Sequence, residues 1–182
     1  MKFIIASDIH GSAYWCEQLL SAFQKEQAEK LVLLGDILYH GPRNNFPCEY
    51  APKEVFAMLN AIKDKITAIR GNCDSEVDQM VLDFPMLADY ALLQADHRLL
   101  FATHGHLFNK DNPPLLNQGD ILLNGHFHTP CIEVTPAGYV YANCGSVALP
   151  KEGYPHTYLV YENDTLTLKD LATGQTVKEY IF

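Results

Sequence analysis

Acidic and imidazole side chains follow the first apolar run of the chain at a spacing that could bind a metal ion. In "MKFIIASDIHGS", Asp8 and His10 are separated by one residue and come directly after an apolar stretch. Alternation along a strand places side chains two positions apart on one face, where a carboxylate and an imidazole could share a cation. The same two residues could instead cap a helix and occupy a turn. The pair alone therefore leaves a metal site and a structural turn as alternatives.

Four further apolar runs end in the same kinds of side chain. Because the carboxyl ends of strands border the ligand crevice in open α/β sheets, residues far apart in sequence can meet there. Glycines at positions 35, 71, 105 and 125 adjoin these groups and permit tight turns or close backbone approach. The ordered set predicts a metal site built from "LVLLGD" (Asp36), "ITAIRGNCD" (Asn72, Cys73, Asp74), "LLFATHGH" (His104, His106) and "ILLNGHFH" (His126, His128).

The elements that must position these residues divide the chain into two halves. Strand and helix signals alternate in the first half, which predicts a βαβαβ unit with a parallel sheet. From about residue 85, short apolar stretches separated by turn residues predict mostly antiparallel strands, in a second sheet or in an extension of the first. We expect one domain over residues 1–182. The Pro- and Gly-rich stretch 39–52 is expected to be a loop, either functional or a surface insertion.

Composition narrows the class of protein. The chain has 182 residues, 48% of them hydrophobic, which is enough to form a sizeable core. Its formal charge of -9, without a basic tail, argues against binding long nucleic acid but allows a small phosphorylated substrate. The N-terminus has only four uninterrupted apolar residues, so we expect no membrane segment or signal peptide and a cytoplasmic protein. The five cysteines lack CxxC spacing, and most of them are expected to be reduced residues that pack in the interior.

Together, the motifs DxH, GD, GN with a following acid, H and GHxH resemble the ordered signature of the calcineurin-like metallophosphoesterases. The resemblance covers nearly the whole chain, and it is strengthened by four stretches similar to small bacterial phosphodiesterases of this family: "ASDIHGS", "HGPRN", "RGNCDSEVDQM" and "THGHLF". It implies an α/β fold, a four-layer α/β/β/α sandwich of two mixed sheets. It also implies a dinuclear metal-dependent phosphodiesterase in which a metal-bound hydroxide attacks the phosphodiester.

The resemblance also implies a ligand set. Asp36 would bridge two divalent cations, since a carboxylate has two oxygens, while neutral imidazoles add affinity without cancelling charge. Manganese is the metal we expect first, with Ni²⁺, Fe²⁺ and Zn²⁺ as alternatives. One ion would be held by Asp8, His10, Asp36 and His128, and the other by Asp36, Asn72, His104 and His126.

Cys73 departs from the broad family, in which many members have histidine at this position. That histidine assists the transition state or protonates the leaving group, whereas a thiol is a weaker donor and cannot carry positive charge. We therefore expect a preference for esters with good leaving groups. Asn72 is expected to act in catalysis as well as in metal binding, and Asp74 to orient neighbouring groups.

Three further residues are candidates for substrate binding. Arg43 in "HGPRN" could hold two phosphate oxygens through its guanidinium group, or could be solvated. His40 belongs to the same motif, and His106 follows a predicted ligand and could contact substrate or support the site. His97 and His156 lie outside the motifs, and we expect them at the surface.

Alternative functions use the same residues. A phosphomonoesterase or nucleotidase could employ the same metal site, and a non-catalytic scaffold of the same fold would be expected to have lost ligands. The formal charge of two dications is balanced by two carboxylates, one hydroxide and one phosphodiester anion. This balance favours a diester over a monoester as the substrate. The expected partner is a small phosphorylated substrate, and similar proteins make a homo-oligomer a further expectation.

Overall fold

The βαβαβ pattern of the first half forms the centre of a six-stranded sheet. The computed structural model describes residues 1–95 and 97–182. The three N-terminal strands pair in parallel, and the chain later returns as an antiparallel meander whose first strand pairs with β1. In the order β11-β10-β9-β1-β2-β3, the strands are Thr176–Ile181, Thr165–Asp170, Thr157–Glu162, Phe3–Ala6, Lys30–Leu33 and Ile66–Ala68.

The remaining strands form a second, five-stranded sheet. Its three central strands β5, β6 and β8 are parallel, whereas β4 and β7 are antiparallel to their neighbours. Both alternatives for the second half are therefore realised, because β9–β11 extend the first sheet and β4–β8 build another. In the order β4-β5-β6-β8-β7, the strands are Tyr90–Ala95, Arg98–Thr103, Ile121–Asn124, Val140–Asn143 and Cys131–Val134.

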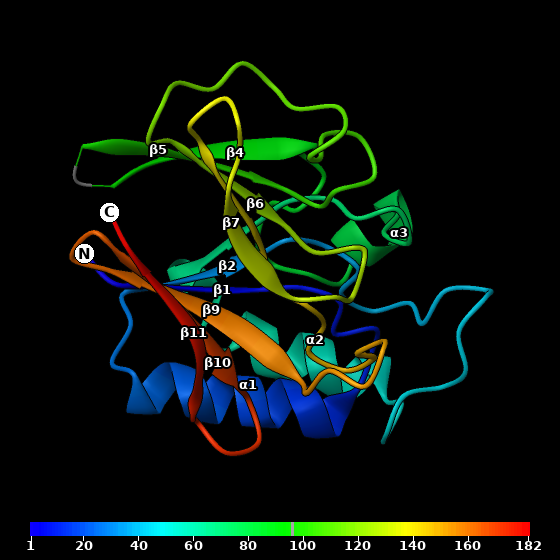
Figure 1. The fold of residues 1–182 in the computed structure, drawn as a ribbon. Helices are drawn as coiled ribbons and strands as arrows, with labels where there is room; N and C mark the ends of the chain where they lie inside the picture. The colour runs from blue at the N-terminus through cyan, green and yellow to red at the C-terminus, as the bar shows by residue number, and fades with distance from the viewer. Residues whose placement is uncertain (96) are drawn as a thin grey trace.

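Helices α1 (Ala13–Lys25) and α2 (Pro52–Asn60) lie on the outer face of the first sheet (Figure 1). The hydroxyl of Ser12 caps α1 by accepting a hydrogen bond from the backbone of Trp15 at 3.3 Å. Pro52 occupies the first turn of α2, where its missing N–H costs no hydrogen bond. A 3₁₀ turn (Lys63–Lys65) precedes β3, and the one-turn helix α3 (Glu76–Gln79) follows it. Among the described residues, no helix is long and apolar enough to cross a bilayer.

Two apolar clusters hold the layers together. One lies between α1, α2 and the first sheet, and the other joins the facing sides of the two sheets. The expected two mixed sheets are confirmed. The outer face of the second sheet is covered by the segment between β5 and β6, whose Phe108 and Leu116 pack on Phe101 and Leu122. Asn and Pro residues in this segment favour turns over a helix, so an irregular segment forms the fourth layer.

Candidate metal centre

Every predicted ligand lies just beyond the carboxyl end of a strand. Asp8 and His10 follow β1, Asp36 follows β2 and Asn72 follows β3, while the histidines of the second half follow β5 and β6. All five strands have parallel neighbours, so their carboxyl ends meet at one edge of the two packed sheets. The backbone topology thus brings residues separated by more than a hundred positions together.

Five of these residues have a left-handed backbone conformation. The φ angles are 60° at Asp8, 49° at His10, 53° at Asp36, 63° at His126 and 62° at His128. Non-glycine residues seldom adopt positive φ, and such residues concentrate at functional sites. The sequence predicted that strand alternation would orient the Asp8 and His10 side chains, and this prediction is wrong because β1 ends at Ala6. Left-handed turns orient them instead.

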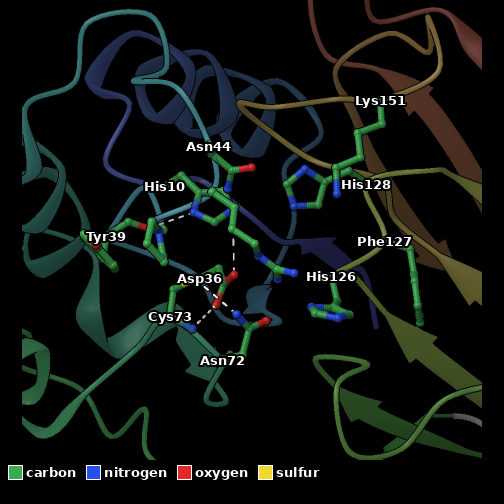
Figure 2. A pocket seen from close by; sticks show the side chains of 13 residues that line it. His10, Asp36, Tyr39, Asn44, Asn72, Cys73, His126, Phe127, His128 and Lys151 are labelled. Atoms are coloured by element: carbon green, nitrogen blue, oxygen red, sulfur yellow. Dashed lines mark hydrogen bonds and ion pairs between the residues drawn. The ribbon is translucent and has the colours of Figure 1, made fainter.

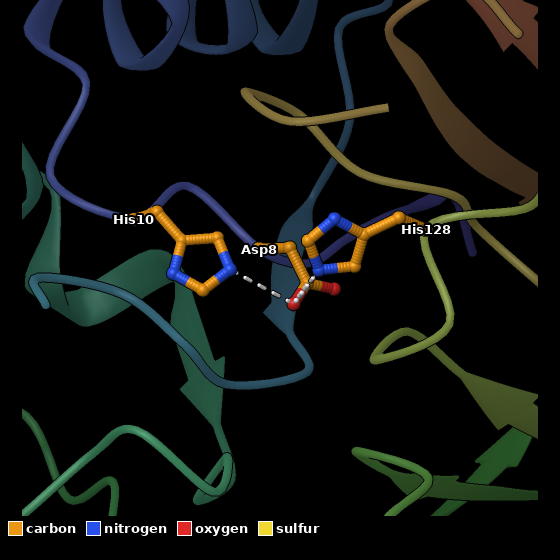
Figure 3. A group of neighbouring side chains, drawn as sticks. All are labelled: Asp8, His10 and His128. Carbon is orange, nitrogen blue, oxygen red and sulfur yellow. Dashed lines mark ion pairs between the residues drawn. The ribbon is translucent and has the colours of Figure 1, made fainter. Parts of the chain in front are cut away.

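Asp8, His10 and His128 form one buried group (Figure 3). Oδ1 of Asp8 lies 3.4 Å from Nε2 of His10 and 3.1 Å from Nε2 of His128. Among the described residues, Asp8 Oδ1 and His10 Nε2 have no hydrogen-bond partner although both atoms are buried. Buried polar atoms are normally paired, so these two atoms are available to a cation.

Asp36 joins this group to a second one. Its Oδ2 lies 3.7 Å from Nε2 of His10 and 3.5 Å from Nε2 of His104. Nε2 of His104 in turn lies 3.0 Å from Oδ1 of Asn72 and 3.2 Å from Nδ1 of His126. Figure 2 shows Asp36 between His10 and the pair formed by Asn72 and His126. The structure therefore brings all seven predicted ligands into one connected cluster with Asp36 at its centre.

Backbone carbonyls fix the orientation of three imidazoles. Nδ1 of His10 lies 2.7 Å from the Tyr39 carbonyl, Nδ1 of His104 lies 2.6 Å from that of Leu34, and Nδ1 of His128 lies 2.5 Å from that of Leu149. A carbonyl only accepts, so each Nδ1 must carry the proton. The Nε2 lone pair of each ring then faces the cluster when the ring is neutral, as in many metal sites.

Burial and charge set the protonation of the cluster. Burial raises the pKa of Asp8, but the imidazoles of His10 and His128 outweigh it and hold this pKa well below its usual range. Burial lowers the pKa of His104, but the carboxylates of Asp36 and Asp8 raise it to about 9. Burial and the charge of His104 lower the pKa of His126 to about 4. Carboxylates held ionised among imidazoles are a donor set that fits divalent transition metals.

Asp74 supports the cluster through the backbone. Its buried carboxylate accepts hydrogen bonds from the N–H groups of Asp36 at 2.7 Å, Gly71 at 2.8 Å and Ile37 at 2.9 Å. Burial and the charge of Asp36 raise the pKa of Asp74 to about 6, against the opposing effect of these donors. The carboxylate thereby holds the turns after β2 and β3 against each other. This position agrees with an orienting role.

The Cys73 thiol lies at the edge of the cluster. Burial and the charge of Asp36 raise its pKa to about 12, so the thiol is neutral near pH 7. Its backbone N–H donates to Oδ1 of Asp36 at 2.8 Å. A neutral thiol is a poor nucleophile, and the backbone of Cys73 helps to orient the central carboxylate.

Two of the predicted glycine positions are required by close packing. A Cβ on Gly71 would lie 2.1 Å from Oδ1 of Asp36, and a Cβ on Gly125 would lie 2.1 Å from Oγ of Ser7 and 2.7 Å from Oδ2 of Asp8. Any other residue would displace a predicted ligand.

A cavity of about 660 Å³ opens over the cluster. Arg43, which the sequence predicts to bind substrate, is exposed and lines this cavity. Asn44, Phe127 and Lys151 also line the cavity, and the sequence did not point to them. Asn44 and Phe127 lie inside the "HGPRN" and "ILLNGHFH" motifs but were assigned no role, and Lys151 lies outside every motif.

The other predicted histidines take different positions. The ring of His40 lies outside the cavity wall, 4.5 Å from Phe46 and 5.2 Å from Tyr50, within the 39–52 loop. The ring of His106 lies 5.3 Å from that of His104, beside the cluster. His97 is exposed as expected. His156 is instead partly buried and stacks on Trp15 at 3.5 Å, because the indole of α1 covers it.

Metal binding is expected to release a proton from His104. With a pKa of about 9, this imidazole is protonated at pH 7.5 in the metal-free protein, and a ligand must be neutral. Titration calorimetry of Mn²⁺ binding in buffers of different ionisation enthalpy should show at least about one proton released and tighter binding as pH rises toward 9. In the metal-free protein, the raised pKa contributes stability that is present below about pH 6.5 and lost as pH rises through 9. A His97→Gln control should release the same proton; no release from either protein would contradict this assignment.

Comparisons with known proteins agree with this geometry. Residues 1–166 match the calcineurin-like phosphoesterase superfamily domain. The chain is 48% identical over 168 residues to phosphodiesterase YfcE of Escherichia coli K12, covering 92% of this chain and 91% of that protein. It is 28% identical over 179 residues to the probable metallophosphoesterase YsnB of Bacillus subtilis, covering 93% and 89%.

A solved structure extends the match to three dimensions. The E. coli phosphoesterase YfcE superposes with a TM-score of 0.96 at 45% identity, covering 99% of this chain and 98% of that one. The family match covers most of the chain and includes all five strand ends that carry the cluster. The protein belongs to the calcineurin-like phosphoesterase superfamily.

Proposed function

We propose that this protein is a phosphodiesterase that uses two divalent metal ions to hydrolyse a small phosphodiester. The observation that carries the proposal is the position of Asp36, whose Oδ2 faces the imidazoles of both His10 and His104. One carboxylate shared between two groups of ligands is the arrangement that a pair of metal ions requires. The 48% identity to phosphodiesterase YfcE supports the same activity.

Each half of the cluster would hold one ion. When bound, the ions supply activation of the attacking water and stabilisation of charge on the phosphoryl oxygens. The backbone N–H of Asp36 donates to the carboxylate of Asp74, which holds Asp36 between the two halves of the cluster. Asn72 contributes an amide oxygen beside His104. The first ion would be held by Asp8, His10, Asp36 and His128, and the second by Asp36, Asn72, His104 and His126.

Arg43 is proposed to bind the phosphoryl group of the substrate. It lies in the turn that begins at Gly41 and exposes its guanidinium group at the cavity wall. Arg43→Ala is expected to raise KM by about ten-fold, because a charged hydrogen bond to phosphate is lost. Arg43→Lys should raise KM less, since it keeps the charge without the two-pronged geometry. Steady-state kinetics measure KM for each variant. An unchanged KM in Arg43→Ala would contradict the binding role of Arg43.

Cys73 is proposed to limit the enzyme to esters with good leaving groups. The neutral thiol is a weak donor beside the cluster and offers little assistance to a departing alkoxide. Cys73→His is expected to raise turnover of poor leaving groups by about 10²-fold, the lower range for general acid catalysis. Rates for a series of aryl esters should show a shallower dependence on leaving-group pKa in the variant. Equal dependence in both proteins would contradict this role.

The diester is favoured over the monoester by charge. Two dications, Asp8, Asp36, hydroxide and one diester anion balance to neutrality, whereas a monoester dianion leaves one negative charge in excess. Initial rates on bis(p-nitrophenyl) phosphate and p-nitrophenyl phosphate, after metal removal and restoration, test the preference. A faster monoester would identify a phosphomonoesterase or nucleotidase, and no turnover of either with any divalent metal would favour a non-catalytic scaffold.

We propose the native metal from the chemistry of its ligands, the cellular compartment from the free thiols, and the oligomeric state from the family resemblance. Mixed carboxylate, amide and imidazole ligands suit Mn²⁺, which we propose as the native ion over Ni²⁺, Fe²⁺ and Zn²⁺. All five cysteines have free thiols, in keeping with a reducing cytoplasm. A homo-oligomer stays a prediction from the family resemblance.

A further inference from the structure

Phe127 and Lys151 form a wall of the cavity that the proposed chemistry leaves unused. Figure 2 shows both residues on the side of the cluster formed by His126 and His128. Phe127 stands between these two histidines in sequence, and 39% of its surface is exposed. Its ring centroid lies 5.1 Å from that of His126, at an angle of 73°. A large apolar ring exposed in a polar cavity can contact an apolar or aromatic part of a ligand.

The backbone fixes Lys151 to the metal cluster. Its N–H donates to the carbonyl of His128 at 3.2 Å, and its own carbonyl accepts from Tyr154 at 3.0 Å. Positive φ angles at Glu152 and Gly153 close the turn that follows it. Nδ1 of His128 also contacts the carbonyl of Leu149 in the same segment. The base of the lysine side chain is therefore held at a set position relative to a predicted ligand.

The ammonium group of Lys151 is available to an anion. Among the described residues, it has no ion pair or hydrogen bond, although it lines the cavity. Lys2, Lys63, Lys110 and Lys169 are each paired with a carboxylate. Lys25, Lys53 and Lys178 lack such a partner among the described residues, as Lys151 does, but they lie outside this cavity. A chain with a formal charge of -9 repels anions in general, so a free cation at the cavity marks the place where one would be accepted.

We propose that Phe127 and Lys151 form a subsite for one ester substituent of the phosphodiester, and that this substituent is an aromatic ring bearing a second negative charge. The ring contacts Phe127, and the charge pairs with Lys151. The inference rests on the proposed phosphodiesterase activity and specifies its substrate class.

The test compares two substrates that release the same p-nitrophenolate. Phenyl p-nitrophenyl phosphate and 4-carboxyphenyl p-nitrophenyl phosphate differ only in one carboxylate. The carboxylated ester is expected to have a KM about five-fold lower, as one partly exposed ion pair would give. Lys151→Ala should abolish this difference and Lys151→Arg should retain it, while raising the salt concentration should reduce it. Phe127→Leu should raise KM for both aryl esters relative to methyl p-nitrophenyl phosphate.

The control is Lys178→Ala, which removes an exposed lysine from β11, outside this cavity, and should preserve the preference. Equal KM values for the two aryl esters in the unmodified protein, or a preference that survives in Lys151→Ala, would overturn the inference. Absence of turnover of both esters by the metal-loaded protein would overturn the proposed function and this inference with it.

Discussion

Replacing Asp36 by asparagine is expected to lower kcat/KM on bis(p-nitrophenyl) phosphate by about 10³-fold, because both metal ions lose a shared ligand. The carboxylate Oδ2 faces His10 and His104 from between the two halves of the cluster. An amide has one oxygen and no charge, so it cannot replace a carboxylate that serves two cations. Bound manganese, measured by mass spectrometry after dialysis, should fall from about two ions per chain to one or fewer.

Asp83→Asn provides the matched control for this substitution. Asp83 is an exposed carboxylate that pairs with Lys63 at 3.1 Å, away from the cavity. This variant should keep the full rate and the full metal content. An Asp36→Asn protein that binds two ions and retains a tenth of the rate would contradict the central position of Asp36.

Asp74→Ala is expected to reduce the free energy of unfolding by about 3–5 kcal/mol, because three buried backbone N–H groups lose their acceptor. These donors belong to Asp36, Ile37 and Gly71. The carboxyl group is almost completely buried, so water cannot replace it without opening the turns after β2 and β3. Urea denaturation of the metal-free protein measures the loss without interference from metal binding.

Asp78→Ala serves as a graded comparison for Asp74. Asp78 accepts one backbone hydrogen bond, from Ser75 at 2.8 Å, in the capping box of α3. Loss of this cap is expected to cost about 1 kcal/mol. If Asp74→Ala were no more destabilising than Asp78→Ala, the proposed support of the metal cluster by Asp74 would be wrong.

Much of the fold could be predicted because its periodicity is strong. Helix α1 buries Ala13, Cys16, Leu19 and Phe23 at helical spacing, and the buried strands of both sheets are short apolar runs bounded by turn residues. The sequence did not decide which strands join which sheet. That choice depends on long-range pairing, such as the pairing of β9 with β1. The sequence of residues 157–162 does not indicate which strand they pair with.

The predicted ligands converge because they all follow parallel strands. The backbone conformation of the individual ligands was predicted less well. The spacing of Asp8 and His10 predicts convergence by strand alternation, whereas both residues adopt positive φ beyond the end of β1. Asp and His tolerate this conformation better than most residues, yet nothing in the sequence indicates where it occurs. Tertiary contacts such as the N–H of His126 donating to Asp8 at 2.9 Å hold it.

The walls of the cavity were predicted least well. Lys151 reaches the cavity because its backbone is bound to His128, 23 positions earlier, and this contact leaves no pattern in the sequence. His40 belongs to the same motif as Arg43, but neighbouring aromatic rings hold its side chain inside the loop. Motifs identify positions at which a metal site requires a particular residue type. The residues that contact the substrate also depend on how the loops pack, which motifs do not show.

Anomalous diffraction from crystals of the protein grown with Mn²⁺ tests the central claim most directly. The proposed site predicts two manganese peaks per chain, about 3.5–4 Å apart, with the carboxylate of Asp36 between them. One peak would lie against Asp8, His10 and His128, and the other against Asn72, His104 and His126. A single peak, or two peaks without a shared Asp36, would contradict the dinuclear site.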